Sequence, residues 1–142
     1  MPGIDISNVK IKGLEPLDFY NNPSYKHWGV SPMSNNIFPF YVEQFKAALG
    51  NKAETPAKDT ELSQPEIKAL QDVFSSLLEE KLKNWKPIDV PPNRQITFKG
   101  KSYEIRVSPV RALDYDIYDF YNIYRLCEEC LNEKKPMYLS VE

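Results

Sequence analysis

Apolar and polar residues alternate most clearly over residues 95–107, near the start of the C-terminal third of the chain. Lys99 and Gly100 separate two alternating runs, and a two-residue loop at this point places Ile96 opposite Tyr103 on the same face. Glycine takes the positive φ that such a turn requires, whereas a register shift of one residue would mix the faces. The pattern predicts a β-hairpin with one apolar face: Ile96, Phe98, Tyr103, Ile105 and Val107.

The segment that follows changes to the three- and four-residue spacing of a helix docked on a sheet. It predicts a helix over about residues 113–134 with a core stripe on one side: Leu113, Ile117, Phe120, Tyr124, Cys127 and Leu131. Nearly opposite lies a tyrosine-bearing stripe: Tyr115, Tyr118, Asn122 and Leu126. Beyond Pro136, the alternation of Met137, Leu139 and Val141 predicts a last strand, which completes a C-terminal β-β-α-β unit.

A second long helix is expected in the middle of the chain, over about residues 64–85. The residues from Ser63 to Glu66 have the form of a capping box, in which each of these two side chains bonds the other residue's backbone amide. The helix carries one broad apolar face: Ile67, Leu70, Val73, Phe74, Leu77, Leu78 and Leu82. Before it, the sequence predicts a short helix over residues 40–49 that ends at Gly50, and a mobile loop over residues 51–62.

The N-terminal part has weaker patterns. β-Branched residues in 4–12 predict a strand with a bulge or turn at Ser7 and Asn8, which we place at the edge of the C-terminal sheet. Four prolines exclude a long helix over residues 13–40, and the many aromatic residues there argue against disorder. We expect residues 1–40 to form an irregular arm packed on the body of one α+β domain, residues 1–142, with a small antiparallel sheet and two main helices.

Composition is that of an ordinary soluble globular protein, with 42% hydrophobic and 27% charged residues. No apolar run approaches the roughly 20 residues of a membrane span, and the chain opens without a secretory signal pattern. We therefore expect a cytoplasmic protein with no membrane partner. The net charge of -2 argues against a dominant electrostatic partner, although basic residues gather over 81–111 and acidic residues over 114–133.

Catalytic and metal chemistry find little support in the sequence. The soft metal ligands are His27, Cys127 and Cys130, and both cysteines fall inside a predicted helix, so we expect no metal and no cofactor. The sequence contains neither a nucleophile elbow nor a glycine-rich phosphate loop. We expect a non-catalytic protein in which His27 has a packing or hydrogen-bonding role. An enzyme of unrecognised type centred on His27 and the arm stays open as an alternative.

The tyrosine-bearing stripe is the leading candidate for a binding surface. We expect a protein interaction module, such as an adaptor, an inhibitor or immunity protein, or a subunit of a larger assembly. It would bind another protein or a second copy through Tyr115, Tyr118, Asn122 and Leu126, with Asp119 and Arg125 at the rim. Tyrosine suits an interface because it offers a large contact area with few rotatable bonds. The competing interpretation is that the N-terminal arm covers this stripe.

The predicted hairpin offers a second surface, for nucleic acid. It combines the cations Lys99, Lys101 and Arg106 with the ring of Tyr103, and stacking rings beside cations are typical of single-strand binding. Two observations oppose this alternative: the rings fall on the face assigned to the core, and the neighbouring helix is acidic.

Overall fold

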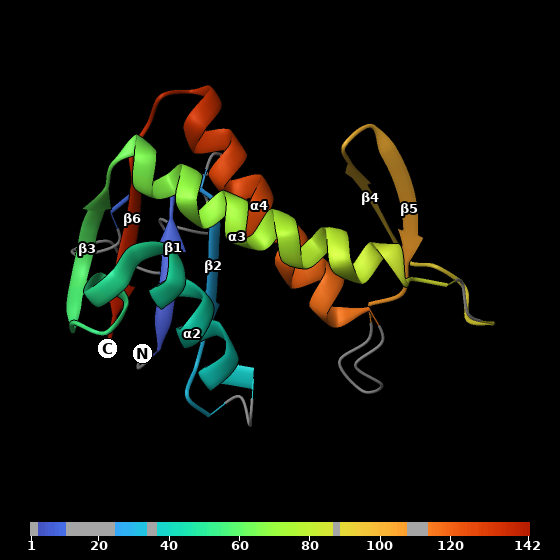
Figure 1. The fold of residues 1–142 in the computed structure, drawn as a ribbon, viewed down its shortest axis with the longest axis horizontal. Coiled ribbons are helices and arrows are strands. Elements are labelled where there is room, and N and C mark those ends of the chain that lie inside the picture. Colours follow the sequence, from blue (N-terminus) through green and yellow to red (C-terminus); the bar gives the residue numbers. More distant parts are fainter. Residues whose placement is uncertain (1–2, 11–24, 34–36, 87–88, 108–113) are drawn as a thin grey trace.

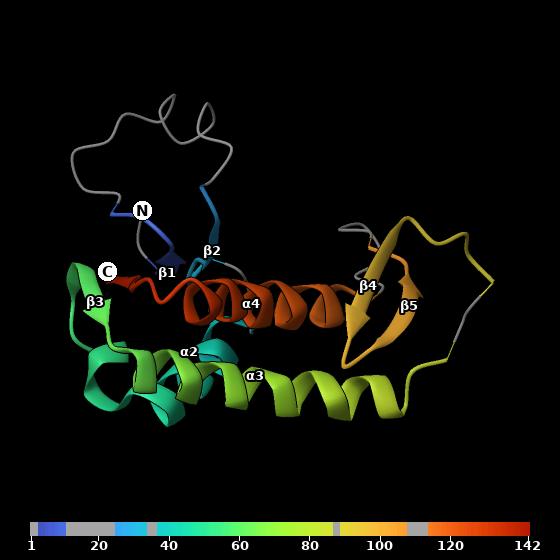
Figure 2. The same cartoon turned by 90° about the horizontal axis from the view of Figure 1, so that it is seen from above.

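The computed structural model describes residues 3–10, 25–33, 37–86, 89–107 and 114–142, and it confirms an α+β fold. The described residues form three α-helices and two antiparallel sheets (Figure 1). Helices α2 (Ile37–Leu49), α3 (Gln64–Lys83) and α4 (Tyr115–Asn132) lie on one face of the larger sheet, and α3 and α4 pack along each other (Figure 2). None of the helices in the described part of the chain is long and apolar enough to cross a membrane.

The larger sheet has four strands in the order β2-β1-β6-β3. They are β1 (Ile4–Ser7), β2 (His27–Val30), β3 (Ala57–Leu62) and β6 (Met137–Val141). The predicted last strand is therefore confirmed, and so is an N-terminal strand that pairs with it. However, the position of the N-terminal strand was wrong. β1 is not an edge strand, because β2 from the predicted irregular arm pairs with its other side.

The predicted hairpin is confirmed as β4 (Arg94–Phe98) and β5 (Lys101–Ile105), with Ile96 opposite Tyr103. Lys99 and Gly100 have φ angles of 51° and 79°, as a two-residue hairpin turn requires. The predicted β-β-α-β sheet is wrong, because this hairpin forms a separate two-stranded sheet. It does not join β6, since both edges of β6 are already paired, with β1 and with β3.

Residues 51–62 are not a loop. A 3-10 turn over Gly50–Ala53 leads into β3, which pairs with β6 and is interrupted between Ala57 and Thr60 by a shift of register. The segment has the polar composition of a loop because β3 is an edge strand whose residues are largely solvent-accessible, and only Leu62 is buried. Polar composition alone therefore did not distinguish an edge strand from a loop.

The helices follow their predicted signals closely. The capping box of Ser63 and Glu66 is present at the start of α3, which ends at Lys83. Helix α2 begins three residues before the predicted position and ends at Leu49, just before Gly50 at φ 64°. Helix α4 begins at Tyr115, and Leu113 of its predicted core stripe lies outside the described residues.

Aromatic rings fill the space between the larger sheet and the three helices. Phe74 of α3 lies at the centre, with its ring centroid 6.2 Å from that of Tyr41, 5.6 Å from that of Phe45 and 5.9 Å from that of Phe120. Trp28 of β2 stacks on Phe45 at 5.8 Å, so a residue of the predicted arm is part of the core. This aromatic cluster fixes how α4 sits on the sheet, and thereby which side of α4 stays uncovered.

Candidate interaction surface

One side of α4 remains open to solvent, and we call Tyr115, Tyr118, Asn122 and Arg125 on this side the α4 face. At 100° per residue these four positions fall within about 80° of one another, so they form one row along the helix. Tyr115 and Arg125 are exposed, whereas Tyr118 and Asn122 are half-buried. The opposite side is buried: Ile117, Phe120, Ile123, Leu126, Cys127 and Cys130. The structure thus brings together four of the six residues predicted for the interface.

The other two predicted interface residues lie on a flank of α4 that is covered. Leu126 is only 5% exposed, so its prediction as a surface contact is wrong. The Asp119 carboxylate is half-buried, accepting hydrogen bonds from Trp28 Nε1 at 3.4 Å and from the Tyr41 hydroxyl at 3.2 Å. Trp28 of β2 and Tyr41 of α2 thus contact Asp119, and α4 packs beside β2 on this flank. Trp28, a residue of the predicted arm, therefore contacts Asp119 at the predicted rim, whereas Tyr115 stays exposed.

Burial changes the protonation chemistry of this flank. Desolvation raises the pKa of Asp119 above its ordinary value, the hydrogen bonds from Trp28 and Tyr41 partly oppose this, and the nearby Asp116 carboxylate adds to it. The pKa of Tyr41 is also raised, first by burial and then by the charge of Asp119, so its hydroxyl stays a hydrogen-bond donor. These groups form a buried polar contact between α2, β2 and α4, not the rim of an interface.

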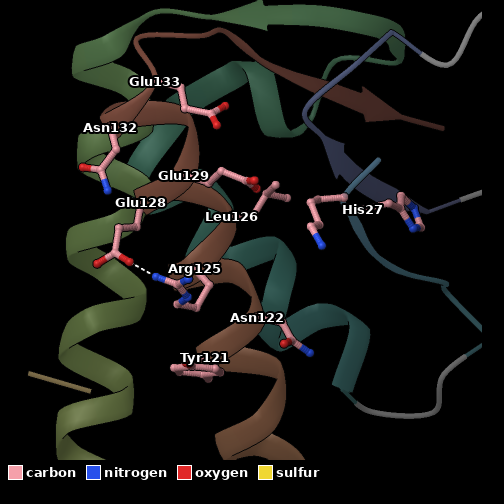
Figure 3. Close-up of a pocket in the computed structure, with 10 residues that line it drawn as sticks. His27, Tyr121, Asn122, Arg125, Leu126, Glu128, Glu129, Asn132 and Glu133 are labelled. Atoms are coloured by element: carbon pink, nitrogen blue, oxygen red, sulfur yellow. Dashed lines mark hydrogen bonds and ion pairs between the residues drawn. The ribbon is translucent and has the colours of Figure 1, made fainter. Parts of the chain in front are cut away.

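A groove of about 550 Å³ runs between α4 and β2, next to the α4 face. Figure 3 shows Asn122, Leu126 and Glu129 pointing toward β2, whereas Arg125 and Glu128 pair with each other farther round the helix. The groove is lined by ten residues: Lys26, His27, Tyr121, Asn122, Arg125, Leu126, Glu128, Glu129, Asn132 and Glu133. The sequence interpretation missed Tyr121 and Glu129, although their helical positions place them beside Arg125 and Asn122.

Strand β4 borders the α4 face on its other side. The Arg94 guanidinium lies 6.0 Å from the centroid of the Tyr118 ring, within the range of a cation–π contact. The Phe98 ring meets the Tyr124 ring edge-on, with 5.1 Å between centroids. The α4 face thus contacts β4 through Tyr118, and the groove beside β2 adjoins it through Asn122 and Arg125.

The hairpin does not present the open rings that the nucleic-acid alternative requires. Phe98 is buried, and the Tyr103 ring stands edge-on against Trp85 at 5.9 Å with the Lys101 ammonium 5.2 Å from its centroid. Lys99 forms an ion pair with Glu79 at 3.1 Å. The cations Lys99 and Lys101 do lie at the surface, as predicted, but the rings beside them are already packed.

Arg106 was wrongly predicted as a surface cation for nucleic acid. It is only 8% exposed, and its guanidinium donates hydrogen bonds to the backbone carbonyls of Val90 and Glu104. Its backbone amide donates to the Asp114 carboxylate at 2.9 Å, just before α4 begins. Arg106 therefore joins the segment before the hairpin, the hairpin itself and the start of α4.

His27 lies at the surface and forms a hydrogen bond, as predicted. Its Nε2 is 2.7 Å from a carboxylate oxygen of Asp5, and its ring points away from α4 (Figure 3). Gly29 makes room for this pair, because a Cβ atom there would lie 2.1 Å from the Asp5 oxygen. Ser7 is opposite His27 in the sheet, but its hydroxyl donates to the Val9 carbonyl at 2.6 Å. No enclosed polar pocket surrounds His27 in the part of the chain that the structure describes.

Cys127 and Cys130 are both buried and free. Burial raises the pKa of both thiols, to about 11 for Cys130. Because the thiolate is the reactive form, we expect neither cysteine to react quickly with DTNB at pH 8 in the folded protein. Both should react after unfolding in guanidinium chloride, which the absorbance of the released thiolate measures. Fast reaction of one thiol per folded chain would contradict the assignment of both cysteines as buried and unreactive.

Among the described residues, no group of three or more His, Cys, Asp or Glu side chains is arranged to hold a metal ion. Comparison of the chain with protein-family models, with curated proteins and with solved structures finds no match.

Proposed function

We propose that the protein binds another protein through the α4 face. The observation that carries this proposal is the row of Tyr115, Tyr118, Asn122 and Arg125, which is exposed at Tyr115 and Arg125 and half-buried between them, opposite the buried side of α4. Tyrosine and arginine are enriched in the energetic centres of protein interfaces, where a flat or shallow surface suffices. The adjoining groove of about 550 Å³, which Asn122 and Arg125 help to line, extends this surface toward β2.

The composition of the groove also favours a protein partner over a small ligand. Small-molecule sites are mostly enclosed and apolar, with a few polar groups that fix orientation. Here the lining mixes Arg125 with Glu128 and Glu129, and the groove is open along α4. Such a mixture of tyrosine, amide and paired charges is typical of protein interfaces, in which polar rim residues surround an aromatic centre.

The double variant Tyr115→Ala/Arg125→Ala tests this proposal. Both side chains are exposed, so the variant should fold like the wild type. We expect it to bind the partner at least about 10-fold more weakly, which corresponds to about 1.4 kcal/mol of binding free energy. Affinity capture from a lysate of the native host, followed by titration calorimetry with the purified partner, measures the loss. Light scattering of the protein alone shows whether the partner is a second copy.

The matched control removes an exposed pair elsewhere. Lys68 and Asp72 form an ion pair on the exposed side of α3, 3.0 Å between Nζ and Oδ1, and Lys68→Ala/Asp72→Ala should leave binding unchanged. If the Tyr115→Ala/Arg125→Ala variant folds and binds as tightly as the control, the α4 face is not the binding surface.

A further inference from the structure

The two edges of the hairpin sheet differ, and the β4 edge borders the α4 face. In a hairpin with a two-residue turn, the residues that flank the turn, Phe98 and Lys101, form a hydrogen-bonded pair. Hydrogen-bonded and non-hydrogen-bonded pairs then alternate along the ladder. The backbone amides and carbonyls of Gln95 and Thr97 on β4, and those of Ser102 and Glu104 on β5, therefore point away from the ladder toward the two edges.

The two edges are not equivalent. On the β5 side, the Arg106 guanidinium donates to the outward carbonyl of Glu104 at 3.2 Å, so one outward acceptor of that edge is already used. On the β4 side, no hydrogen bond from any other described residue reaches the backbone of Gln95 or Thr97. β4 also lacks the proline or bulge by which proteins often block an exposed edge, since its register with β5 is regular. The β4 edge is thus open to strand pairing.

A strand added to this edge would lie over the α4 face. β5 reaches α3 through the contact of Tyr103 with Trp85, whereas β4 reaches α4 through the contacts of Arg94 with Tyr118 and Phe98 with Tyr124. The hairpin sheet therefore runs from α3 across to α4, at the end of these helices that lies away from β3 (Figure 2). Neighbouring strands are about 4.8 Å apart, so a third strand beyond β4 comes next to Tyr118 and Arg125.

The charges around this edge indicate the chemistry of the occupant. Among the described residues no carboxylate pairs with Arg94, whose guanidinium lies over the Tyr118 ring, whereas Lys99 at the end of β4 pairs with Glu79. Antiparallel pairing of two β4 strands from two copies would gather both Arg94 side chains along one ladder, where like charges repel. Acidic side chains at the flanks of the added strand would instead be attracted to Arg94. This charge pattern favours a different protein over a second copy.

We infer that the partner presents an extended segment, with acidic residues and alternating apolar side chains, which adds to the Gln95 and Thr97 edge of β4 and covers the α4 face. This is strand addition to an exposed sheet edge, in which backbone hydrogen bonds give affinity and alternate side chains give specificity. The inference rests on the proposed function and specifies the form of the partner.

Two proline variants on opposite strands test this inference. Thr97 and Ser102 face each other as a non-hydrogen-bonded pair, so Thr97→Pro removes an outward amide on β4 and Ser102→Pro removes one on β5, while the ladder keeps its hydrogen bonds. The probe is a phage library of random twelve-residue peptides, selected on the wild-type full chain. We expect enriched peptides to bind Thr97→Pro at least 10-fold more weakly than wild type, and Ser102→Pro within about twofold. Peptides that bind Thr97→Pro as tightly as wild type would overturn the inference, as would a selection without any peptide that depends on Thr97.

Amide exchange in the wild type provides a second measurement, which stands even if a proline variant fails to fold. Bound peptide should slow hydrogen exchange at Gln95 and Thr97 at least 10-fold, and unchanged exchange there overturns the inference. The variant Tyr115→Ala/Arg125→Ala separates the two proposals. If Tyr115→Ala/Arg125→Ala weakens peptide binding but Thr97→Pro does not, the α4 face is the binding surface and the inference of strand addition is rejected. If neither variant weakens peptide binding, both proposals are rejected.

Discussion

Replacing Phe74 with alanine is expected to lower the free energy of unfolding by about 3–5 kcal/mol, the largest effect that we predict for a single core residue. The Phe74 side chain is completely buried, and it contacts rings from α2 and α4. Its loss leaves a cavity bordered by three large, rigid rings, which have little freedom to collapse inward. Urea unfolding followed by circular dichroism measures the change through the shift of midpoint at constant slope.

The control for this experiment is Ser76→Ala, an exposed position on the same helix, which should change the free energy of unfolding by less than about 0.5 kcal/mol. A loss below about 1.5 kcal/mol for Phe74→Ala would show that the aromatic cluster can repack. In that case the position of α4 would not depend on Phe74, and other contacts would have to determine which side of α4 is open to solvent.

Local signals in the sequence predicted the individual elements well. The capping box at Ser63, the glycine after α2 and the two-residue turn at Lys99 and Gly100 each act within a few residues, so one segment suffices to recognise them. The alternation of Met137, Leu139 and Val141 predicted β6 for the same reason, because a strand buried on one face must repeat with a period of two.

Pairing between distant strands could not be predicted in the same way. Whether β6 pairs with the hairpin or with β1 and β3 depends on which edges are free once α4 has packed, and no local pattern records this. β3 was missed because an edge strand carries polar residues, as loops do. β2 was missed because His27–Val30 is short and lies within a segment rich in proline and aromatic residues.

The candidate interaction surface was likewise predicted where local sequence sufficed, and missed where tertiary packing decided. A helical wheel separated the buried side of α4 from the side that carries Tyr115 and Arg125, and that separation holds for both residues. It could not locate the edges of the exposed side of α4, because these depend on which other elements pack against the helix. Leu126 and Asp119 stand only about 20° and 40° from Tyr115 on the wheel, yet Leu126 is buried, and Trp28 of β2 and Tyr41 of α2 contact Asp119.

Asp119→Ala is expected to cost about 2–4 kcal/mol of stability, because it leaves the Trp28 indole N–H and the Tyr41 hydroxyl without their acceptor. Asp119→Asn should cost less, since the amide oxygen can accept one of these hydrogen bonds and no charge is buried. Urea unfolding of both variants at pH 7 gives the two values. An exposed rim residue would show almost no loss in either variant, so the result also tests the assignment of Asp119 to the core.

The pH dependence of stability distinguishes the charge of Asp119 from its hydrogen bonds. Burial raises the pKa of Asp119 in the folded protein, so between the ordinary Asp pKa of about 3.9 and the raised value the folded state binds more protons than the unfolded state. This contribution to stability is complete below pH 3.9 and is lost as the pH rises through the folded pKa. Urea unfolding from about pH 3.5 to pH 8 gives the difference in unfolding free energy between wild type and Asp119→Asn. In this difference the contributions of the carboxylates that both proteins share cancel. We expect this difference to fall with increasing pH and then level off. A difference that rises with pH would mean that the folded protein stabilises Asp119 as the anion. The hydrogen bonds from Trp28 and Tyr41 would then favour the anion more than burial disfavours it.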